Sequence, residues 1–228
     1  MPHEQTAAAA AQPLPPTELR VELDGSLVEL TDIPIAPLTY PVAPNKVLRK
    51  AQIAEVPVEQ RGTLLGLCYE LFVGRWNEVQ FGPCIQGSVF ELQLGAEPSH
   101  ISYLDGYLTL YLEQASSHMH LCLGAHTGLK HTTPSELARV RQCTRVAFAR
   151  TLGENRQPHS WAIQLWNGAG EQMITFFLPS PFLDMERQKR LREPVWSHLD
   201  LWNDLRARYL GERTPQPLPI ERGSGGCG

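Results

Sequence analysis

The chain lacks most of the features that identify a function directly. Its five cysteines include no Cys-x-x-Cys pair, which argues against a disulfide scaffold and against an all-cysteine zinc or iron–sulfur site. No stretch approaches about 18 uninterrupted apolar residues, so we expect no membrane span. The Gly-x-Ser-x-Gly elbow and the phosphate-loop and dinucleotide fingerprints are also missing. The common nucleophilic and nucleotide-binding motifs therefore give no indication of function.

A strong net charge is absent as well. With 228 residues and a formal charge of −4, the chain has no overall field that would attract nucleic acid, and we expect no such partner. Its 42% hydrophobic and 19% charged residues suit one large or two small globular domains. The N-terminal segment has an alanine run but no basic region, which makes it a poor signal peptide. The simplest expectation is a soluble protein of the reducing cytoplasm.

Unusual chemistry is concentrated in the segment 116–126, Ser-Ser-His-Met-His-Leu-Cys-Leu-Gly-Ala-His. On a β-strand successive side chains point to opposite faces, so His118, His120 and Cys122 would share one face. Imidazole and thiolate are usual side-chain ligands of borderline and soft metals. The segment therefore predicts a site for zinc or iron.

Strand geometry limits which of these side chains can bind one ion. Neighbouring Cβ atoms on one face lie about 6.6 Å apart and the outer two about 13 Å apart, so we expect His118 and His120 to form the ligand pair. The candidates for completing the site are Cys122 on a bulged strand, His126, Cys84, Cys143 and an external ligand. The competing interpretation is that hydrogen bonds satisfy the histidines and that the free cysteine packs as a small hydrophobe.

Other charged residues could support such a site. Asp105, Glu91 and Glu113 could orient a ligand imidazole or move a proton, although each is more often a surface or turn residue. Basic residues also follow on one side of an expected helix, and they indicate either a solvated face or an anion site. These are Arg139, Arg141, Arg145 and Arg150.

Hydrophobic periodicity predicts an α+β fold, in which about three helices pack on a mostly antiparallel sheet. Short turns join the expected strands 100–104, 107–112 and 117–123, so these strands form an antiparallel meander. The register decides whether the histidine-bearing face lies beside Thr109 and Tyr111 or beside the leucines that alternate with them.

Turn and cap signals place the remaining elements. Asp24-Gly25 and Asn167-Gly168 each predict a hairpin between strands of alternating or aromatic residues. A proline at the first turn predicts a helix over 57–73, and a capping box with proline predicts a second helix over 134–152. Helical spacing of apolar residues predicts a third helix over 197–210.

These signals divide the chain into four parts. Residues 1–17 are expected to form a disordered tail, and 18–56 an edge hairpin with a proline-rich connector. Residues 57–211 are expected to form the α+β core domain, and 212–228 a flexible tail that carries Cys227.

Several phrases together carry a resemblance to a known group of proteins. They are Phe81-Gly-Pro-Cys84, Gly87–Glu91, Leu104–Thr109, His118-Met-His-Leu-Cys122, Ser160-Trp161 and Leu165–Met173. Over roughly residues 60–210 the chain resembles a group of uncharacterised bacterial proteins that share a domain of unknown function. The resemblance implies a bacterial origin and no particular activity.

Three hypotheses of function follow. The first is a metal-binding protein, with zinc or iron on His118 and His120, that works as a metal-dependent hydrolase or lyase with an open metal position. The second is a non-catalytic metal or haem carrier or interaction module, in which the tail with Cys227 assists transfer. The third is a structural protein without an ion. A small molecule or a metal-transfer partner fits the first two, and the sequence does not indicate an oligomeric state.

Overall fold

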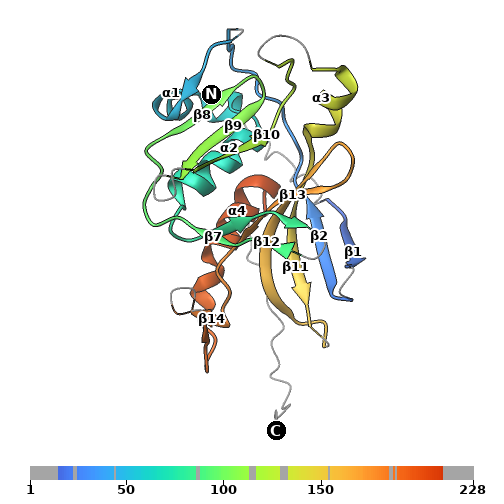
Figure 1. Cartoon of the computed structure of the whole chain (residues 1–228). Helices are drawn as coiled ribbons and strands as arrows, with labels where there is room; N and C mark the ends of the chain where they lie inside the picture. Colours follow the sequence, from blue (N-terminus) through green and yellow to red (C-terminus); the bar gives the residue numbers. More distant parts are fainter. Residues whose placement is uncertain are drawn as a thin grey trace, which may run out of the picture.

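The structure is a computed structural model of the whole chain (Figure 1). It describes residues 15–22, 25–43, 45–85, 88–112, 117–128, 133–153, 155–184, 187 and 189–212, with the backbone alone for 84 and 85. Most of the expected tails, including Cys227, lie outside the described residues. None of the helices in the described part has both the length and the apolar character that a membrane crossing needs.

Two antiparallel sheets form the framework, as the α+β prediction requires. The seven-stranded sheet contains, in spatial order, β1 (Thr17–Val21), β2 (Leu27–Asp32), β11 (Cys143–Leu152), β12 (Pro158–Asn167), β13 (Gln172–Phe177), β4 (Gln80–Gly82) and β7 (Leu92–Gln93). The four-stranded sheet contains β10 (Ser117–Cys122), β9 (Tyr107–Leu112), β8 (Ile101–Leu104) and β3 (Leu48–Arg49). Two short hairpins pair β5 (Cys84–Ile85) with β6 (Ser88–Val89) and β14 (Leu183–Asp184) with β15 (Lys189–Arg190).

The helices are shorter than the expected ones, and the described residues form four α-helices where about three were expected. They are α1 (Lys50–Glu55), α2 (Thr63–Tyr69), α3 (Ser135–Arg141) and α4 (Asp200–Leu210). Single turns of 3-10 or π-helix flank them at η1 (Val58–Gln60), η2 (Glu70–Gly74) and η4 (Trp196–Leu199).

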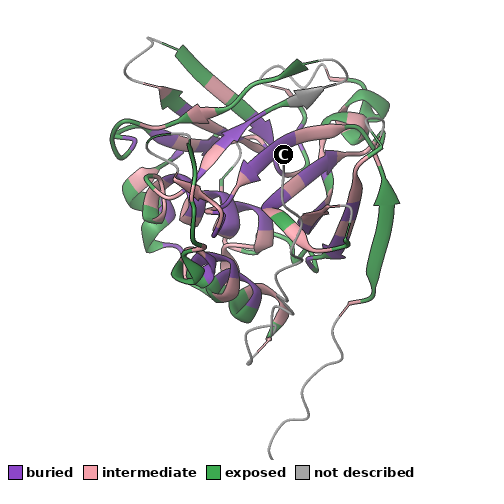
Figure 2. Ribbon diagram, turned by 90° about the horizontal axis from the view of Figure 1, so that it is seen from below, coloured by how far each residue is buried: buried purple, intermediate pink, exposed green. Residues whose placement is uncertain are grey.

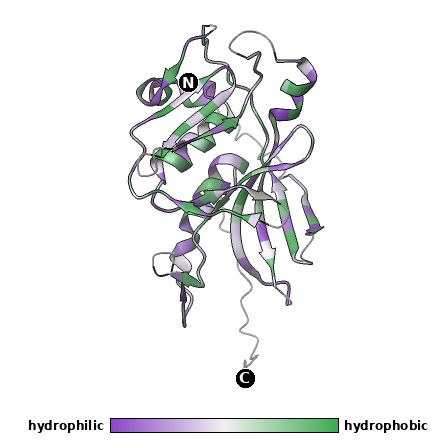
Figure 3. Ribbon diagram, in the orientation of Figure 1, coloured by the Kyte–Doolittle hydropathy of each residue, from purple (hydrophilic) through white to green (hydrophobic). Residues whose placement is uncertain are grey.

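One large core joins both sheets with α2 and α4. Phe72, which follows α2, packs edge-on against Phe81 of β4 and Phe176 of β13, with ring centroids 4.9 and 5.1 Å away. Trp202 of α4 packs against Phe148 of β11 at 5.1 Å. Figure 2 shows the buried positions on the central strands, and Figure 3 shows hydrophobic and hydrophilic residues mixed along them. The helices therefore cover sheet faces through the apolar stripes that the sequence provides.

The predicted meander and hairpins are confirmed. β8, β9 and β10 pair in chain order, and β12 pairs with β13. The side-chain oxygen of Asn167 accepts hydrogen bonds from the backbone N–H groups of Ala169 and Glu171, and Gly170 has a φ of 78°. The β1–β2 hairpin also forms, and β2 continues into the sheet by pairing with β11. The predicted hairpin therefore forms, but the positive φ of its turn falls on Gly170 and not on the Asn167-Gly168 pair.

The helix predicted over 134–152 is wrong in its second half. α3 ends at Arg141, Gln142 is extended with a ψ of 137°, and residues from Cys143 onward form β11. β11 lies between β2 and β12, and the run 146–149 is buried on both faces of the sheet. Burial on both faces removes the period-two pattern, so a central strand reads as a continuous apolar run.

The helix predicted over 57–73 begins later than expected, and α1 was not predicted. Pro57 opens only the single turn η1, and α2 begins at Thr63 after Gly62, whose φ is 72°. A Cβ atom at Gly62 would lie 2.6 Å from the backbone nitrogen of Leu38. The hydroxyl of Thr63 donates to the carbonyl of Pro34. The proline-rich connector therefore docks where a straight helix would have continued.

Candidate functional site

One face of the four-stranded sheet carries the residues of the histidine motif. The register pairs His118 with Tyr111 and His120 with Thr109, so these four side chains lie on the same face. The opposite face belongs to the core. Its leucines are nearly inaccessible: Leu108 and Leu110 are each 1% exposed and Leu121 is 5% exposed. We call the histidine-bearing face the open face.

His118 and His120 lie together on the open face, as the strand alternation predicts. Their ring centroids are 4.8 Å apart, with the planes at 74°. His120 Nδ1 is 2.8 Å from the hydroxyl oxygen of Thr109, and this bond fixes the ring orientation and leaves Nε2 available. Partial burial and the neighbouring His118 lower the pKa of His120. Two exposed imidazoles are therefore paired, and one of them is held by a hydroxyl group.

Cys122 and His126 form a second, internal pair. Cys122 Sγ lies 3.2 Å from His126 Nδ1, and the hydroxyl of Tyr107 lies 3.4 Å from His126 Nε2. Cys122 is 4% exposed and His126 is 6% exposed. Burial raises the pKa of the Cys122 thiol, and the nearby Tyr107 hydroxyl offsets only part of this. Both ring nitrogens of His126 are thus occupied within the protein.

A turn holds His126 in place. Asp105 and Gly106 connect β8 to β9, both with positive φ, 45° and 81°. The carbonyl of Gly106 accepts hydrogen bonds from the backbone N–H groups of Leu123 and Gly124. This contact turns the chain after β10 toward the open face. A Cβ atom at Gly106 would lie 2.5 Å from the carbonyl oxygen of Gly124, so glycine is needed there.

The other candidate ligands are not brought to the histidine pair. Cys84 belongs to β5, which pairs with β6 outside the four-stranded sheet. Cys143 begins β11, and its burial raises the pKa of its thiol to about 12. Among the described residues, no group of three or more histidine, cysteine, aspartate and glutamate side chains is placed to hold a metal ion. Within this part of the chain, the protein itself offers at most two ligands on the open face.

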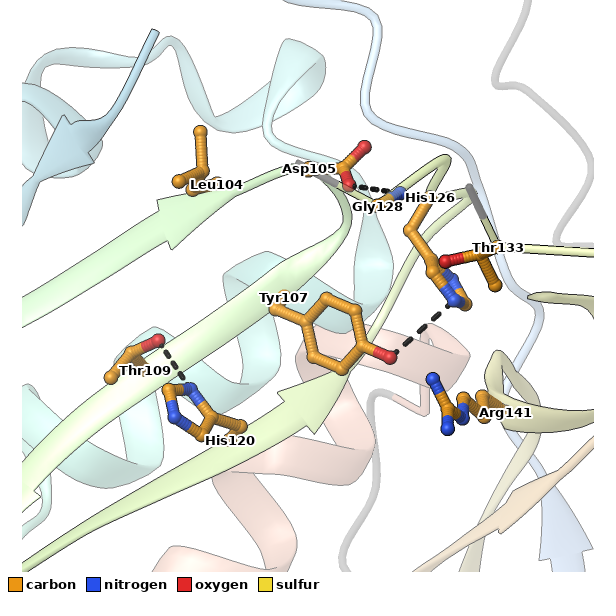
Figure 4. A pocket seen from close by; sticks show the side chains of 9 residues that line it. All are labelled: Leu104, Asp105, Tyr107, Thr109, His120, His126, Gly128, Thr133 and Arg141. Carbon is orange, nitrogen blue, oxygen red and sulfur yellow. Dashed lines mark hydrogen bonds between the residues drawn. The ribbon is translucent and has the colours of Figure 1, made fainter. Parts of the chain in front are cut away.

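A pocket of about 340 Å³ lies at the end of the open face (Figure 4). Its polar lining comes from three parts of the chain: the β8–β9 hairpin, the β10 segment with the loop after it, and α3. The lining residues are Leu104, Asp105, Tyr107, Thr109, His120, His126, Gly128, Thr133 and Arg141. The motif histidines 120 and 126 therefore meet in a cavity even though they do not meet at one ion.

The carboxylate of Asp105, which lines the pocket, already accepts hydrogen bonds from the loop after β10. Asp105 accepts hydrogen bonds from the backbone N–H and hydroxyl of Thr127 at 3.0 and 3.2 Å, and from the backbone N–H of Gly128 at 2.7 Å. Burial opposes its ionisation, but these hydrogen bonds together outweigh burial and lower the pKa of Asp105. The carboxylate thus serves the loop that carries His126 and does not act as a free acceptor in the cavity.

Arg141 differs from the arginines that follow it in sequence. Arg145 pairs with Glu18 and Asp32 at 2.6 and 2.7 Å, and Arg150 pairs with Glu29. Within the described part of the chain Arg141 has no carboxylate partner, and its guanidinium group lies near the Tyr107 hydroxyl in the pocket (Figure 4).

Sequence patterns identify the histidines of the pocket, name Thr109 as one register alternative and include Arg141 in a basic face, but they do not indicate Tyr107. The strand register would have indicated Thr109, since it lies opposite His120. The basic side of the expected helix included Arg141 but did not distinguish it from Arg145, which lies on a strand. The two arginines differ because α3 ends at Arg141 and β11 begins at Cys143.

Neither the curated proteins nor the solved structures contain a match to this chain. The model of one protein family matches residues 42–211, which cover the whole four-stranded sheet, the pocket and α4. The match agrees with the resemblance noted from the sequence and begins before its expected start near residue 60. The chain therefore belongs to a family of unknown function, DUF7676.

Proposed function

We propose that the protein binds a small organic anion in the pocket at the end of the open face. The observation that carries this proposal is the lining of the cavity. It includes an arginine that pairs with no carboxylate of the described residues, two imidazoles and a phenol, while its carboxylate is already hydrogen bonded. A cavity of about 340 Å³ lies within the range of small-molecule sites.

The side chains suit a carboxylate or phosphate group. The guanidinium group of Arg141 can donate two parallel hydrogen bonds to such a group. Tyr107 and His120 also line the cavity. His120 Nε2 can donate to the same anion, and the Tyr107 hydroxyl can do so when His126 Nε2 is the donor in the bond between these two residues. Leu104 supplies an apolar wall. The ligand expected here has an anionic end and an apolar or ring-shaped body.

A titration followed by NMR tests the proposal. Succinate, citrate, benzoate and inorganic phosphate are added in turn to the full chain while the histidine ring resonances are recorded. At least one anion should bind with a dissociation constant below about 1 mM and shift the signals of His120 and His126. Arg141→Gln should weaken it about tenfold or more, since a hydrogen bond to a charged group contributes about 1.5–3 kcal/mol.

Arg139→Gln is the matched control, because Arg139 lies on the same helix but does not line the pocket. The proposal fails if none of the four anions shifts these resonances, or if both arginine substitutions have the same effect.

A second candidate function is transition-metal binding by His118 and His120. It is supported by the 4.8 Å separation of the rings and by the hydroxyl of Thr109 that orients one of them. Two protein ligands leave at least two positions of a tetrahedral zinc ion for water, a substrate or a transfer partner. A hydrolase, a lyase and a carrier all use such open positions, whereas closed structural sites fill all four.

Zinc titration of protein without a histidine tag tests this candidate. One equivalent of zinc should bind to the wild-type chain, and His118→Ala and His120→Ala should each weaken binding at least tenfold. His159→Ala is the control, since His159 is exposed on β12 of the other sheet. Equal zinc binding by all three variants would rule out the pair as the metal site.

A further inference from the structure

A second and larger cavity adjoins the pocket. It has a volume of about 900 Å³ and lies between α1 and the open face. Leu104, Thr109 and His120 line both cavities, so the two spaces meet at the centre of the sheet. A ligand anchored in the pocket therefore has room to continue along the sheet.

Aromatic and imidazole side chains lie beside this second cavity. Tyr111 lies between His100 and His118, with ring centroids 6.1 and 5.6 Å from its own. Although β9 has a strand on each side, the Tyr111 side chain is 46% exposed. An exposed aromatic ring on an interior strand offers its face to a ligand. Planar rings pack on such faces by stacking or edge-on contact.

Spacing along β9 relates the ring to the anion pocket. Tyr107 and Tyr111 lie two residues to either side of Thr109, which corresponds to about 7 Å in each direction along a strand. Tyr107 lines the pocket with Arg141, and Tyr111 lines the second cavity. The exposed helix residues Ala51 and Ala54 add apolar surface to the same cavity.

Among the described residues that line the second cavity there is no carboxylate, whereas Arg49 and Lys50 are among them. Lys50 is already paired with Glu97 at 2.6 Å and donates to the carbonyl of Pro98. The cavity thus combines apolar and aromatic surface with a mildly positive edge. A neutral or anionic aromatic group suits this lining better than a cationic group does.

We propose that the bound molecule is an aromatic acid, with its anionic group beside Arg141 and its planar ring against Tyr111 in the second cavity. This inference rests on the proposed anion pocket and adds the chemical class of the rest of the ligand. It assigns Tyr111 to ring recognition and Arg141 to recognition of the charge.

Two probes with the same carbon skeleton test it: biphenyl-4-carboxylate, which has two planar rings, and bicyclohexyl-4-carboxylate, which is saturated. Calorimetric titration of the full chain should give about fivefold or more tighter binding of the aromatic acid, because of its ring contacts. Tyr111→Leu should bring the two affinities together by weakening only the aromatic acid. Arg141→Gln should weaken both acids by the same factor.

Three other outcomes would contradict the aromatic inference. If both acids bind equally and Arg141→Gln weakens both, the anion pocket stands and the aromatic inference is wrong. If the aromatic acid keeps its advantage in Tyr111→Leu, the ring lies elsewhere and the inference is again wrong. If neither acid binds, the inference fails, and the pocket proposal then depends on the smaller anions alone.

Discussion

The two sheets of this protein use their faces differently. In β11 of the seven-stranded sheet, the run 146–149 is buried at every position: Val146 and Phe148 belong to the main core, and Ala147 and Ala149 belong to a second apolar cluster. In β9 of the four-stranded sheet, buried leucines alternate with Thr109 and Tyr111, which remain partly or largely exposed. The open face is therefore not needed to fill the core, and its polar residues are available for a ligand.

The same contrast decides what the sequence can predict. The short turns between β8, β9 and β10 predict the meander, and alternation along β10 predicts the shared face of His118 and His120. β11 is buried on both faces and carries no such alternation, so the capping box at the start of α3 predicts a helix that continues through it. The pocket was missed for another reason. Arg141 and Tyr107 come from α3 and β9, and only the packed fold brings them together with His126.

Removing a core ring from the seven-stranded sheet should have the largest effect. Phe148→Ala should lower the free energy of unfolding by about 3–5 kcal/mol, since Phe148 is 1% exposed and packs on Trp202. Urea denaturation measures this value. A loss below about 1 kcal/mol would contradict close packing of Phe148 in the core.

Arg206, which lies in the core, can be compared with Arg141, which lines the pocket. Arg206 forms an almost fully buried ion pair with Glu212 and lies over the rings of Phe148 and Trp202. Arg206→Ala should lower the free energy of unfolding by about 3 kcal/mol, because it leaves a buried carboxylate unpaired. Replacing both partners, as in Arg206→Leu with Glu212→Leu, should restore much of the loss. Equal stability of the single and double variants would contradict this explanation.

Acidification should change the affinities for the two candidate ligands of the open face, an anion and zinc, in opposite directions. The pKa of His120 lies below the ordinary imidazole value, so the ring is mainly neutral at pH 7. Lowering the pH protonates it, which should strengthen binding of benzoate and weaken binding of zinc, because protons compete with a metal for Nε2. Because the pKa of His120 is lowered, the change falls below the ordinary imidazole value of about 6.5, and titrations of each probe at neutral pH and at several lower values measure these slopes. His120→Gln should flatten the dependence on pH.

Substitutions on the open face should have the smallest effect on folding. Thr109→Val removes the hydroxyl that holds His120 and leaves the leucines of β9 in place. We expect a change of at most about 0.5 kcal/mol in the free energy of unfolding, as for most surface substitutions. Chemical denaturation measures it. A larger loss would mean that the Thr109–His120 bond is structural.

Measuring both properties of Arg141→Gln tests the central claim most directly, namely that the open face and its pocket serve binding and not folding. The account predicts an unfolding free energy within about 0.5 kcal/mol of the wild-type value together with an anion affinity about tenfold lower. A variant that loses stability while it binds succinate, citrate, benzoate and phosphate as the wild-type chain does would contradict it.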